Sequence, residues 1–168
     1  MSPDKIAAAL TFVVVLASML VAHNVGDHWV QTGVQERDKG LRGDQMWKGR
    51  LACLRHVVSY TVCTALVVAM MWALFDLRIS LFSFALGQLI SAVTHFWADR
   101  RLPLQRLAEL VDRLHGLRGE AVGTFYRLGA PRAGKDDNLV LGTGRYALDQ
   151  AWHWWWIFIA SVVTAVAA

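Results

Sequence analysis

The chain has 168 residues, of which 55% are hydrophobic and only 18% are charged, and its mean hydropathy is +0.36. With three prolines and eight tryptophans, this composition excludes a disordered chain and argues against a water-soluble domain. The formal net charge of +4 raises the question of nucleic acid, and the distribution of the charges along the chain gives a different answer.

Four apolar runs predict transmembrane helices, because each approaches the roughly 20 residues that cross a bilayer. They cover residues of about 6–30, 51–75, 79–97 and 146–166. The turn between the second and third runs is so short that these two helices must run antiparallel. We therefore expect an all-α membrane protein, a single transmembrane domain over residues 1–168 built as an antiparallel bundle of four helices.

The loop at 98–145 begins with a predicted amphipathic helix, in the segment RRLPLQRLAELVDRLHGL. Apolar residues recur there at helical spacing, opposite charged ones: Leu104, Leu107, Leu110, Val111 and Leu114. Such a helix is expected to lie along the membrane surface. The glycine-rich remainder, 119–145, predicts an irregular loop. By hypothesis, Asp136 and Asp137 within it cover the opening of the site described below.

The cations predict an orientation. Fifteen of the seventeen lysines and arginines flank or fill the loops at 32–50 and 98–145, and only Lys5 and Arg78 fall on the other side. The positive-inside rule therefore places both loops in the cytoplasm and both termini outside. The expected partners are the lipid bilayer, anionic lipid headgroups and a protein bound at the cytoplasmic loops. Nucleic acid is disfavoured, and a homo-oligomer is left open.

Ionisable side chains inside the predicted helices are the most informative feature, because they are costly in a bilayer and usually have a role. Each helix carries one pair spaced i, i+4, namely His23 and Asp27, His56 and Tyr60, His95 and Asp99, and Asp149 and His153. Residues at this interval share a helix face. Counted at about 1.5 Å per residue, all four pairs fall in the cytoplasmic third of the membrane. The pattern predicts one shared site between the helices.

The residue types in these pairs favour a divalent metal ion such as zinc, manganese or iron, with room for two ions. The candidate ligands are His23, Asp27, His56, His95, Asp99, Asp149 and His153. Asp27, Asp99 and Asp149 are also the candidate catalytic bases. Two alternatives stay open: the carboxylates orient metal-bound imidazoles, or the pairs only join the helices.

Other residues receive structural interpretations. Cys53 and Cys63 lie ten residues apart on one predicted helix, too far for a disulfide, and are interpreted as packing residues. His28 is either a second member of the site or a loop contact. His115 is expected to be solvent-exposed.

Four segments, AHNVGDHWVQT, LRHVVSYT, AVTHFWADRR and YALDQAWHW, carry a family resemblance. In this order they resemble the small polytopic membrane proteins grouped as domain of unknown function 3307, found in bacteria, phages and other mobile elements. The resemblance spans nearly the whole chain and implies the bacterial cytoplasmic membrane as the location, but no activity. The matched positions are His23, Asp27, Gln31, His56, Tyr60, His95, Asp99, Asp149, Gln150 and His153. The long third loop departs from the shorter members.

Two functions compete. The favoured one is a non-enzymatic accessory or partner-recruiting protein of a bacterium or mobile element, in which the polar cluster joins the helices. The alternative is a metal-dependent hydrolase that acts on a lipid or lipid-linked substrate at the cytoplasmic face, where a bound ion would activate water. A looser, architectural resemblance to membrane-bound metal-dependent hydrolases supports the second. An ion carrier is weaker, because the polar residues stop at one level.

Overall fold

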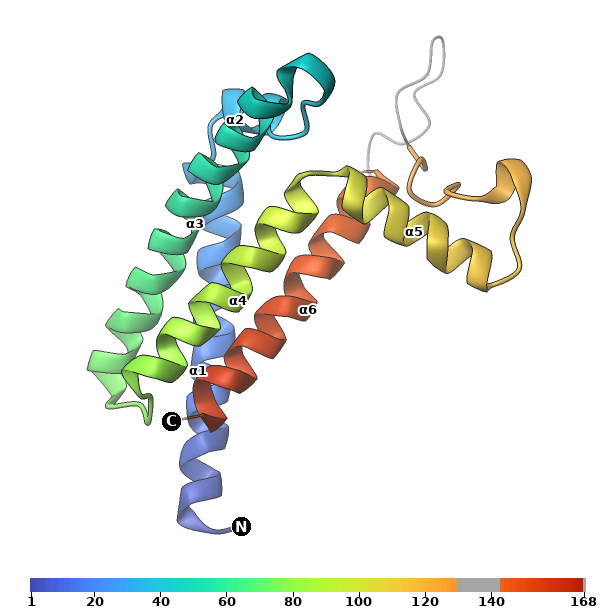
Figure 1. Ribbon diagram of the computed structural model, residues 1–168. Coiled ribbons are helices and arrows are strands. Elements are labelled where there is room, and N and C mark those ends of the chain that lie inside the picture. Colours follow the sequence, from blue (N-terminus) through green and yellow to red (C-terminus); the bar gives the residue numbers. More distant parts are fainter. Residues whose placement is uncertain (130–142, 168) are drawn as a thin grey trace.

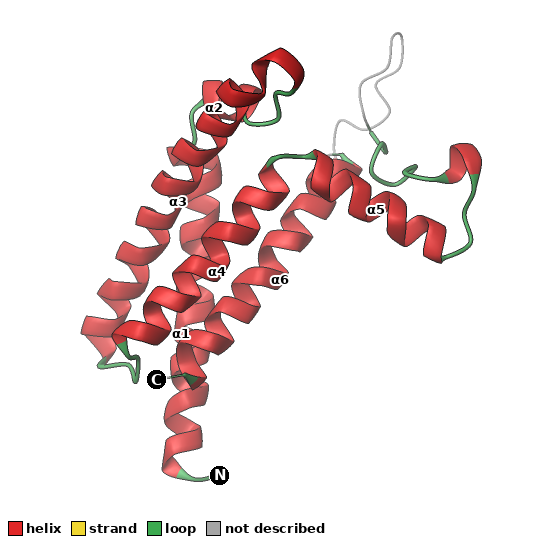
Figure 2. Ribbon diagram, viewed as in Figure 1, coloured by secondary structure: helices red, strands yellow, loops and turns green. Residues whose placement is uncertain are grey.

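The computed structural model describes residues 1–129 and 143–167, and every regular element within these ranges is helical (Figures 1 and 2). The helices are α1 (Pro3–Val25), α2 (Gly33–Asp38), α3 (Met46–Phe75), α4 (Leu81–Asp99), α5 (Leu102–Leu114) and α6 (Gly144–Val166). A π-helical turn, Gly26–Val30, extends α1, and short 3-10 turns lie at Gly43–Gln45 and Gly119–Ala121. Asp136 and Asp137, and the position predicted for them, lie outside the described residues.

Three helical stretches are long and apolar enough to cross a membrane: Pro3–Val30, Gly43–Phe75 and Leu81–Asp99. Many of their large apolar side chains point outward and are exposed, as lipid-facing side chains would be, among them Leu10, Leu54, Leu66 and Leu89. The fourth predicted span, helix α6, is long enough but is not among these candidates. Its first turns contain Asp149, Gln150 and His153, which lower its mean hydropathy.

The four long helices pack side by side, α1 against α3 and α6, and α4 against α3 and α6 (Figure 1). Helices α4 and α6 approach closely where Gly87 faces Thr164. A Cβ at Gly87 would lie 2.1 Å from Thr164 Oγ1 and 3.0 Å from the carbonyl oxygen of Ala160. Small residues of this kind allow two helix backbones to approach closely without a large hydrophobic core.

An apolar cluster fills the end of the helix assembly nearer the termini. Its buried members come from α1, α3, α6 and the α3–α4 turn, and they are Val15, Met19, Val68, Leu77, Ile79, Ile157 and Ala160. The turn closes tightly because Asp76 adopts a left-handed conformation and Ser80 caps α4 through a capping box with Ser83. The predicted hairpin is therefore present, with α4 starting two residues later than the predicted 79 because Ser80 is the cap.

The predicted loop at 32–50 is largely ordered by hydrogen bonds. Thr32 and Gln35 form a capping box that starts α2, and α3 begins at Met46, earlier than the predicted 51. The Arg100 guanidinium at the end of α4 donates to the carbonyl oxygens of Lys39 and Leu41, at 2.5 and 2.8 Å. These contacts hold the segment after α2 against the end of α4.

The amphipathic helix predicted in the third loop is present as α5, with Pro103 in its first turn. It leaves the end of α4 and runs away from the four long helices, touching α6 near its start (Figure 1). Leu104 is buried, whereas Leu110, Val111 and Leu114 are exposed. The helix is therefore confirmed, while its position at a membrane surface stays a prediction.

Candidate metal centre

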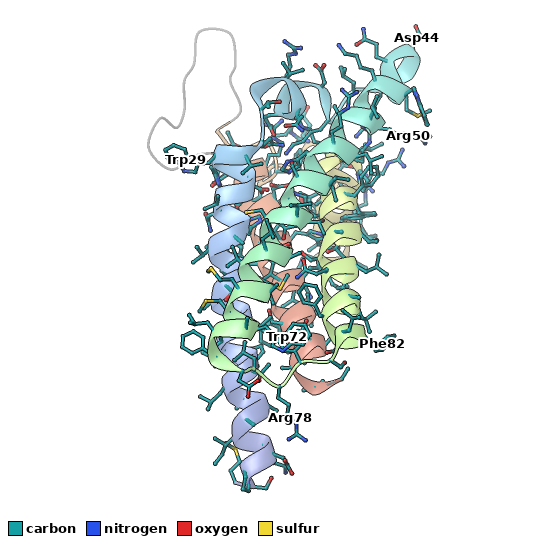
Figure 3. The ribbon with its side chains drawn as sticks, turned by 90° about the vertical axis from the view of Figure 1, so that its left-hand side faces the viewer. Trp29, Asp44, Arg50, Trp72, Arg78 and Phe82 are labelled. Carbon is teal, nitrogen blue, oxygen red and sulfur yellow. The ribbon has the colours of Figure 1, made fainter. Side chains whose placement is uncertain are left out.

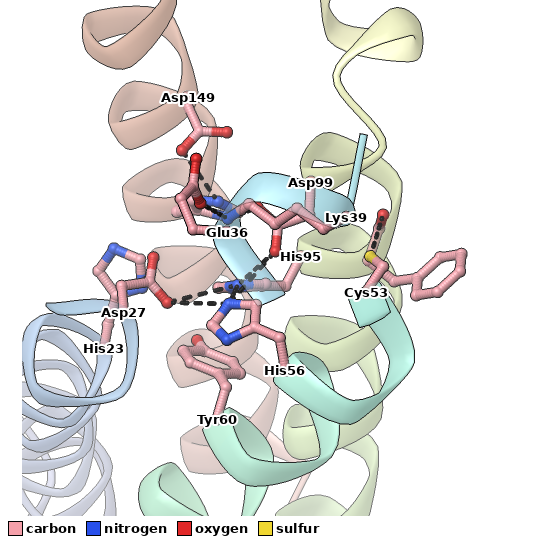
Figure 4. Close-up of polar contacts among 12 residues, drawn as sticks. His23, Asp27, Glu36, Lys39, Cys53, His56, Tyr60, His95, Asp99 and Asp149 are labelled. Carbon is pink, nitrogen blue, oxygen red and sulfur yellow. Dashed lines mark hydrogen bonds and ion pairs between the residues drawn. The ribbon is translucent and has the colours of Figure 1, made fainter. Parts of the chain in front are cut away.

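The polar pairs predicted on the four long helices converge on one region (Figure 4). In three of the pairs the two side chains also contact each other. His23 Nδ1 lies 3.6 Å from Asp27 Oδ2, His95 Nε2 lies 3.4 Å from Asp99 Oδ2, and His153 Nε2 lies 3.5 Å from Asp149 Oδ2. Elements distant in sequence thus place imidazoles and carboxylates side by side.

Four side-chain atoms face one another most closely: Asp27 Oδ1, His56 Nε2, His95 Nε2 and Asp99 Oδ2. The two imidazole nitrogens are 2.9 Å apart. Asp27 Oδ1 lies 3.4 Å from each of them. Asp99 Oδ2 lies 3.2 Å from His56 Nε2 and 3.4 Å from His95 Nε2. Each carboxylate oxygen therefore lies close to both imidazole nitrogens, and the ligand atoms of His56, His95 and Asp99 all lie within 4.8 Å of one another.

The separations between each carboxylate oxygen and the two imidazole nitrogens can be compared with those around a tetrahedral ion. Zinc binds nitrogen and oxygen ligands at about 2.0–2.2 Å, so a tetrahedral set places its ligand atoms roughly 3.3–3.6 Å apart. The distances from the carboxylate oxygens to the imidazole nitrogens fall close to that range, and the distance between the imidazoles is shorter. The four side chains are almost completely buried, with exposed fractions between 0% and 8%.

The hydrogen bonding supports the same assignment. Asp27 Oδ1 and Asp99 Oδ2 are buried without a hydrogen-bond partner, although imidazole nitrogens lie close to both. An unpaired buried carboxylate oxygen is costly, and paired oxygens would be expected if the cluster served only to join helices. A divalent cation bound beside the two imidazoles would give these oxygens a partner. The residues present therefore fit a metal ion.

Other groups adjoin this set. Asp99, Asp149 and His153 form a further trio whose ligand atoms lie within 4.8 Å of one another, as do His23, Asp27 and His95. The imidazole of His153 stacks on that of His95, with ring centroids 4.1 Å apart. His23 Nε2 is hydrogen-bonded to Gln150 Oε1 at 3.1 Å.

Tyr60 and the two cysteines lie in or near the wall of the site. The Tyr60 ring packs on His95 with centroids 4.0 Å apart, and its hydroxyl is hydrogen-bonded to Ser91 Oγ at 2.8 Å. Cys53 and Cys63 are free, as predicted, and their thiols face the carbonyl oxygens of Phe96 and Ala22. Neither cysteine belongs to a possible metal-binding group among the described residues.

The remaining two histidines lie away from the four converging atoms. His28 Nε2 is hydrogen-bonded to the Tyr146 hydroxyl at 3.2 Å, while its Nδ1 faces the carbonyl oxygen of Asn24. His28 therefore contacts α6 instead of a loop, and it lines the cavity described below. His115 is exposed at the end of α5, as predicted.

Lys39 also belongs to this region, although the sequence distinguishes it only as one of the loop cations. Its ammonium lies 2.8 Å from Asp99 Oδ1 and 2.7 Å from Glu36 Oε2, and its side chain is 8% exposed. Burial alone would lower the pKa of Lys39, but the charges of Asp99 and Glu36 outweigh it and hold that pKa above its ordinary value. The i, i+3 spacing of Glu36 and Lys39 was the available signal.

A cavity of about 210 Å³ opens over the cluster from the loop side. Asp27, Asp99 and Asp149 line it together with Lys39 and residues of the loops: His28, Gln31, Glu36, Arg101, Tyr126, Arg145, Tyr146 and Gln150. Asp149 is 25% exposed, whereas Asp99 is 1% exposed. A small polar molecule can therefore reach Asp149 from this side, while Asp99 lies buried beneath the cavity.

Comparison of the chain with known protein families, with curated proteins and with solved structures finds no match. The chain thus combines membrane-like apolar helices with His/Asp groups that could bind a metal ion.

Proposed function

We propose that the protein crosses the membrane four times, with α6 as the fourth span, and that α1, α3, α4 and α6 form an antiparallel bundle. Support comes from the packing of α6 against both α1 and α4. Its polar residues face the shared site, so they need not face lipid. Asp44 and Arg50 lie at one end of the molecule and Arg78 near the other (Figure 3). The cation-rich end is cytoplasmic, and both termini are outside.

The central element of the proposal is a divalent metal ion held by Asp27, His56, His95 and Asp99, with zinc as the leading candidate. The observation that carries it is that one oxygen of Asp27 and one of Asp99 each lie 3.2–3.4 Å from both imidazole nitrogens, while both oxygens lack hydrogen bonds. His23 lies beside Asp27 Oδ2 and orients that carboxylate. The mixed imidazole and carboxylate set also admits manganese or iron.

We further propose that the centre is hydrolytic. A divalent ion supplies Lewis acidity that activates water and polarises the bond to be cleaved. Of the three predicted bases, Asp27 and Asp99 are committed to the ion, whereas Asp149 lines the cavity and is partly exposed. Asp149 therefore accepts the proton of the attacking water, and its neighbour His153, at 3.5 Å, holds the carboxylate in position.

The alternative is the non-enzymatic accessory protein that the sequence favoured. The ordered segment around α2 is the observation that speaks for it, because a folded cationic loop offers a surface for a protein partner. The orphaned carboxylate oxygens and the open cavity favour the metal-dependent hydrolase instead. The resemblance to domain of unknown function 3307 is compatible with either.

Metal analysis of the detergent-purified protein tests the proposal. The wild type is expected to hold one ion per chain, and His95→Ala and Asp27→Ala to hold none. Asp149→Ala should retain the ion and lose hydrolysis of phosphate and carboxylate esters. A metal-free wild type whose variants only lose thermal stability would establish the helix-joining role instead.

A further inference from the structure

Two hollows adjoin at the loop end of the molecule. The polar cavity over the cluster shares Leu104 and Tyr126 with a larger apolar groove of about 470 Å³. The groove lies between α5 and the first half of α6, and it is lined mainly by Leu107, Ala108, Val111, Leu148, Ala151 and Trp155. One molecule with a polar head and an apolar tail can therefore occupy both.

The charges of the polar cavity favour an anionic head. Lys39, Arg101 and Arg145 line it, opposite four carboxylates from Asp27, Glu36, Asp99 and Asp149. A bound divalent cation gives this lining a net positive charge, which attracts an anion. Burial raises the pKa of Tyr126, so its hydroxyl remains a hydrogen-bond donor at the junction of the two hollows.

The apolar groove in turn suits an acyl chain. Its lining is aliphatic and aromatic, and α5 presents its apolar face there while its opposite face is charged. A helix of this kind lies in the membrane interface with its apolar face at the boundary between headgroups and acyl chains. A sugar or peptide would leave the groove uncovered, whereas a lipid tail fills it.

We propose that the substrate is a lipid whose headgroup is a single phosphate, with the phosphate in the polar cavity and one acyl chain in the groove between α5 and α6. This rests on the proposed metal-dependent hydrolysis and names its substrate class. In the reaction, the oxygen of water bonds to phosphorus and the bond from phosphorus to the lipid oxygen breaks. Asp149 takes a proton from the water and returns it to the leaving oxygen, giving a lipid alcohol and inorganic phosphate.

Lipid retention tests the two hollows independently of turnover. The full-length protein, reconstituted with equal amounts of dioleoyl phosphatidic acid and dioleoyl phosphatidylcholine, is extracted in mild detergent, and the retained lipid is measured by native mass spectrometry. The wild type should retain phosphatidic acid. Ala151→Trp, which fills the groove, should lower retention about tenfold, because about two methylenes of chain lose their burial. Ala147 is an exposed position on the same helix and lines neither hollow. The variant Ala147→Trp is therefore the matched control and should retain phosphatidic acid.

The head is tested by Arg145→Gln, which should remove the preference for phosphatidic acid while retention of phosphatidylcholine stays unchanged. Equal retention of both lipids by the wild type, or a loss equal in Ala151→Trp and Ala147→Trp, would overturn the proposal.

Turnover separates this proposal from the one it rests on. Release of inorganic phosphate from phosphatidic acid by the metal-loaded protein is expected, together with slow release from glycerol 3-phosphate, which lacks the chain. Metal-dependent hydrolysis of other esters without release from phosphatidic acid would refute the substrate class and leave the hydrolase standing. A protein that retains phosphatidic acid but binds no metal would refute the hydrolase, and this substrate assignment with it.

Discussion

The two ends of the helix assembly treat buried polar atoms in opposite ways. Near the termini, hydroxyls bond to carbonyl oxygens of their own helices, such as Ser161 to Ile157 and Thr164 to Ala160, both at 2.8 Å. At the loop end, five buried atoms of His23, Asp27, His95, Asp99 and His153 lack hydrogen bonds. Two further such atoms, Thr61 Oγ1 and Trp156 Nε1, lie in the middle of α3 and α6, so the unsatisfied polar atoms are concentrated at the loop end but not confined to it. Stability and function are therefore expected to separate along the length of the helices.

The largest expected effect follows from removing one ligand. Asp27→Asn keeps the shape of the side chain and weakens its bond to the ion, so the metal Kd should rise about a hundredfold or more, since the four ligands share a binding free energy of roughly 10–16 kcal/mol. Isothermal titration of the purified protein measures it. Asp149→Asn should keep the Kd of the ion within a few fold of the wild-type value. An equal rise of the Kd in both variants would contradict the ligand assignment.

Removing the ion should destabilise the wild type alone. A ligand at a hundredfold excess over its Kd stabilises the folded state by about 2.7 kcal/mol, which for a chain of this size corresponds to a shift of about 5–10 °C in Tm. A chelator should therefore lower the Tm of the wild type by that amount and leave the Tm of Asp27→Asn unchanged. Equal shifts would mean that the chelator acts elsewhere.

Lys39 links the loop to the cluster, so its replacement should loosen the loop without disturbing the far end. Lys39→Met leaves Asp99 Oδ1 and Glu36 without their buried ammonium, at a local cost of about 3 kcal/mol. Hydrogen exchange measured by mass spectrometry should speed up across Gly33–Asp38. Exchange near Gly87 and Thr164 should stay at the wild-type rate. Uniform acceleration would show that the two ends are not separable.

At the opposite end, Gly87→Ala should weaken the packing of the helices without changing metal binding. The added methyl group meets Thr164 Oγ1, so α4 and α6 must separate or Thr164 must move, at a cost of about 1–3 kcal/mol. The Tm should fall while the metal Kd stays at its wild-type value. Leu89→Ala, on the exposed face of the same helix, is the control and should change neither.

The smallest effect concerns pH. The Arg37 guanidinium and the Lys48 ammonium hold the pKa of Asp38 at about 2, below its ordinary value of 3.8. Because the folded protein lowers this pKa, the stabilisation is complete above about pH 4 and is lost as the pH falls through about 2. The difference in Tm between wild type and Asp38→Asn should be small at neutral pH and vanish over that acidic range. A difference that grows on acidification would contradict the assignment.

The sequence predicted the helices and the pairs more fully than the way the pairs meet. The i, i+4 spacing of His23 and Asp27, of His95 and Asp99, and of Asp149 and His153 correctly placed each pair on one helix face, because helix geometry is local, and the side chains of each pair lie within 3.6 Å. The spacing could not rank the ligands, since that depends on how far each helix is rotated toward the others. Lys39 escaped prediction for the same reason, because α2 and Arg100 place it through long-range contacts.

The π-helical turn at Gly26–Val30 sets the direction in which Asp27 points. Such a turn holds one residue more than a regular one, and it is less favourable than an uninterrupted α-helix. Deleting Gly26 would remove the extra residue and rotate Asp27 by about 100° relative to α1. The shortened helix would be regular, and the Asp27 carboxylate would no longer face His56 and His95.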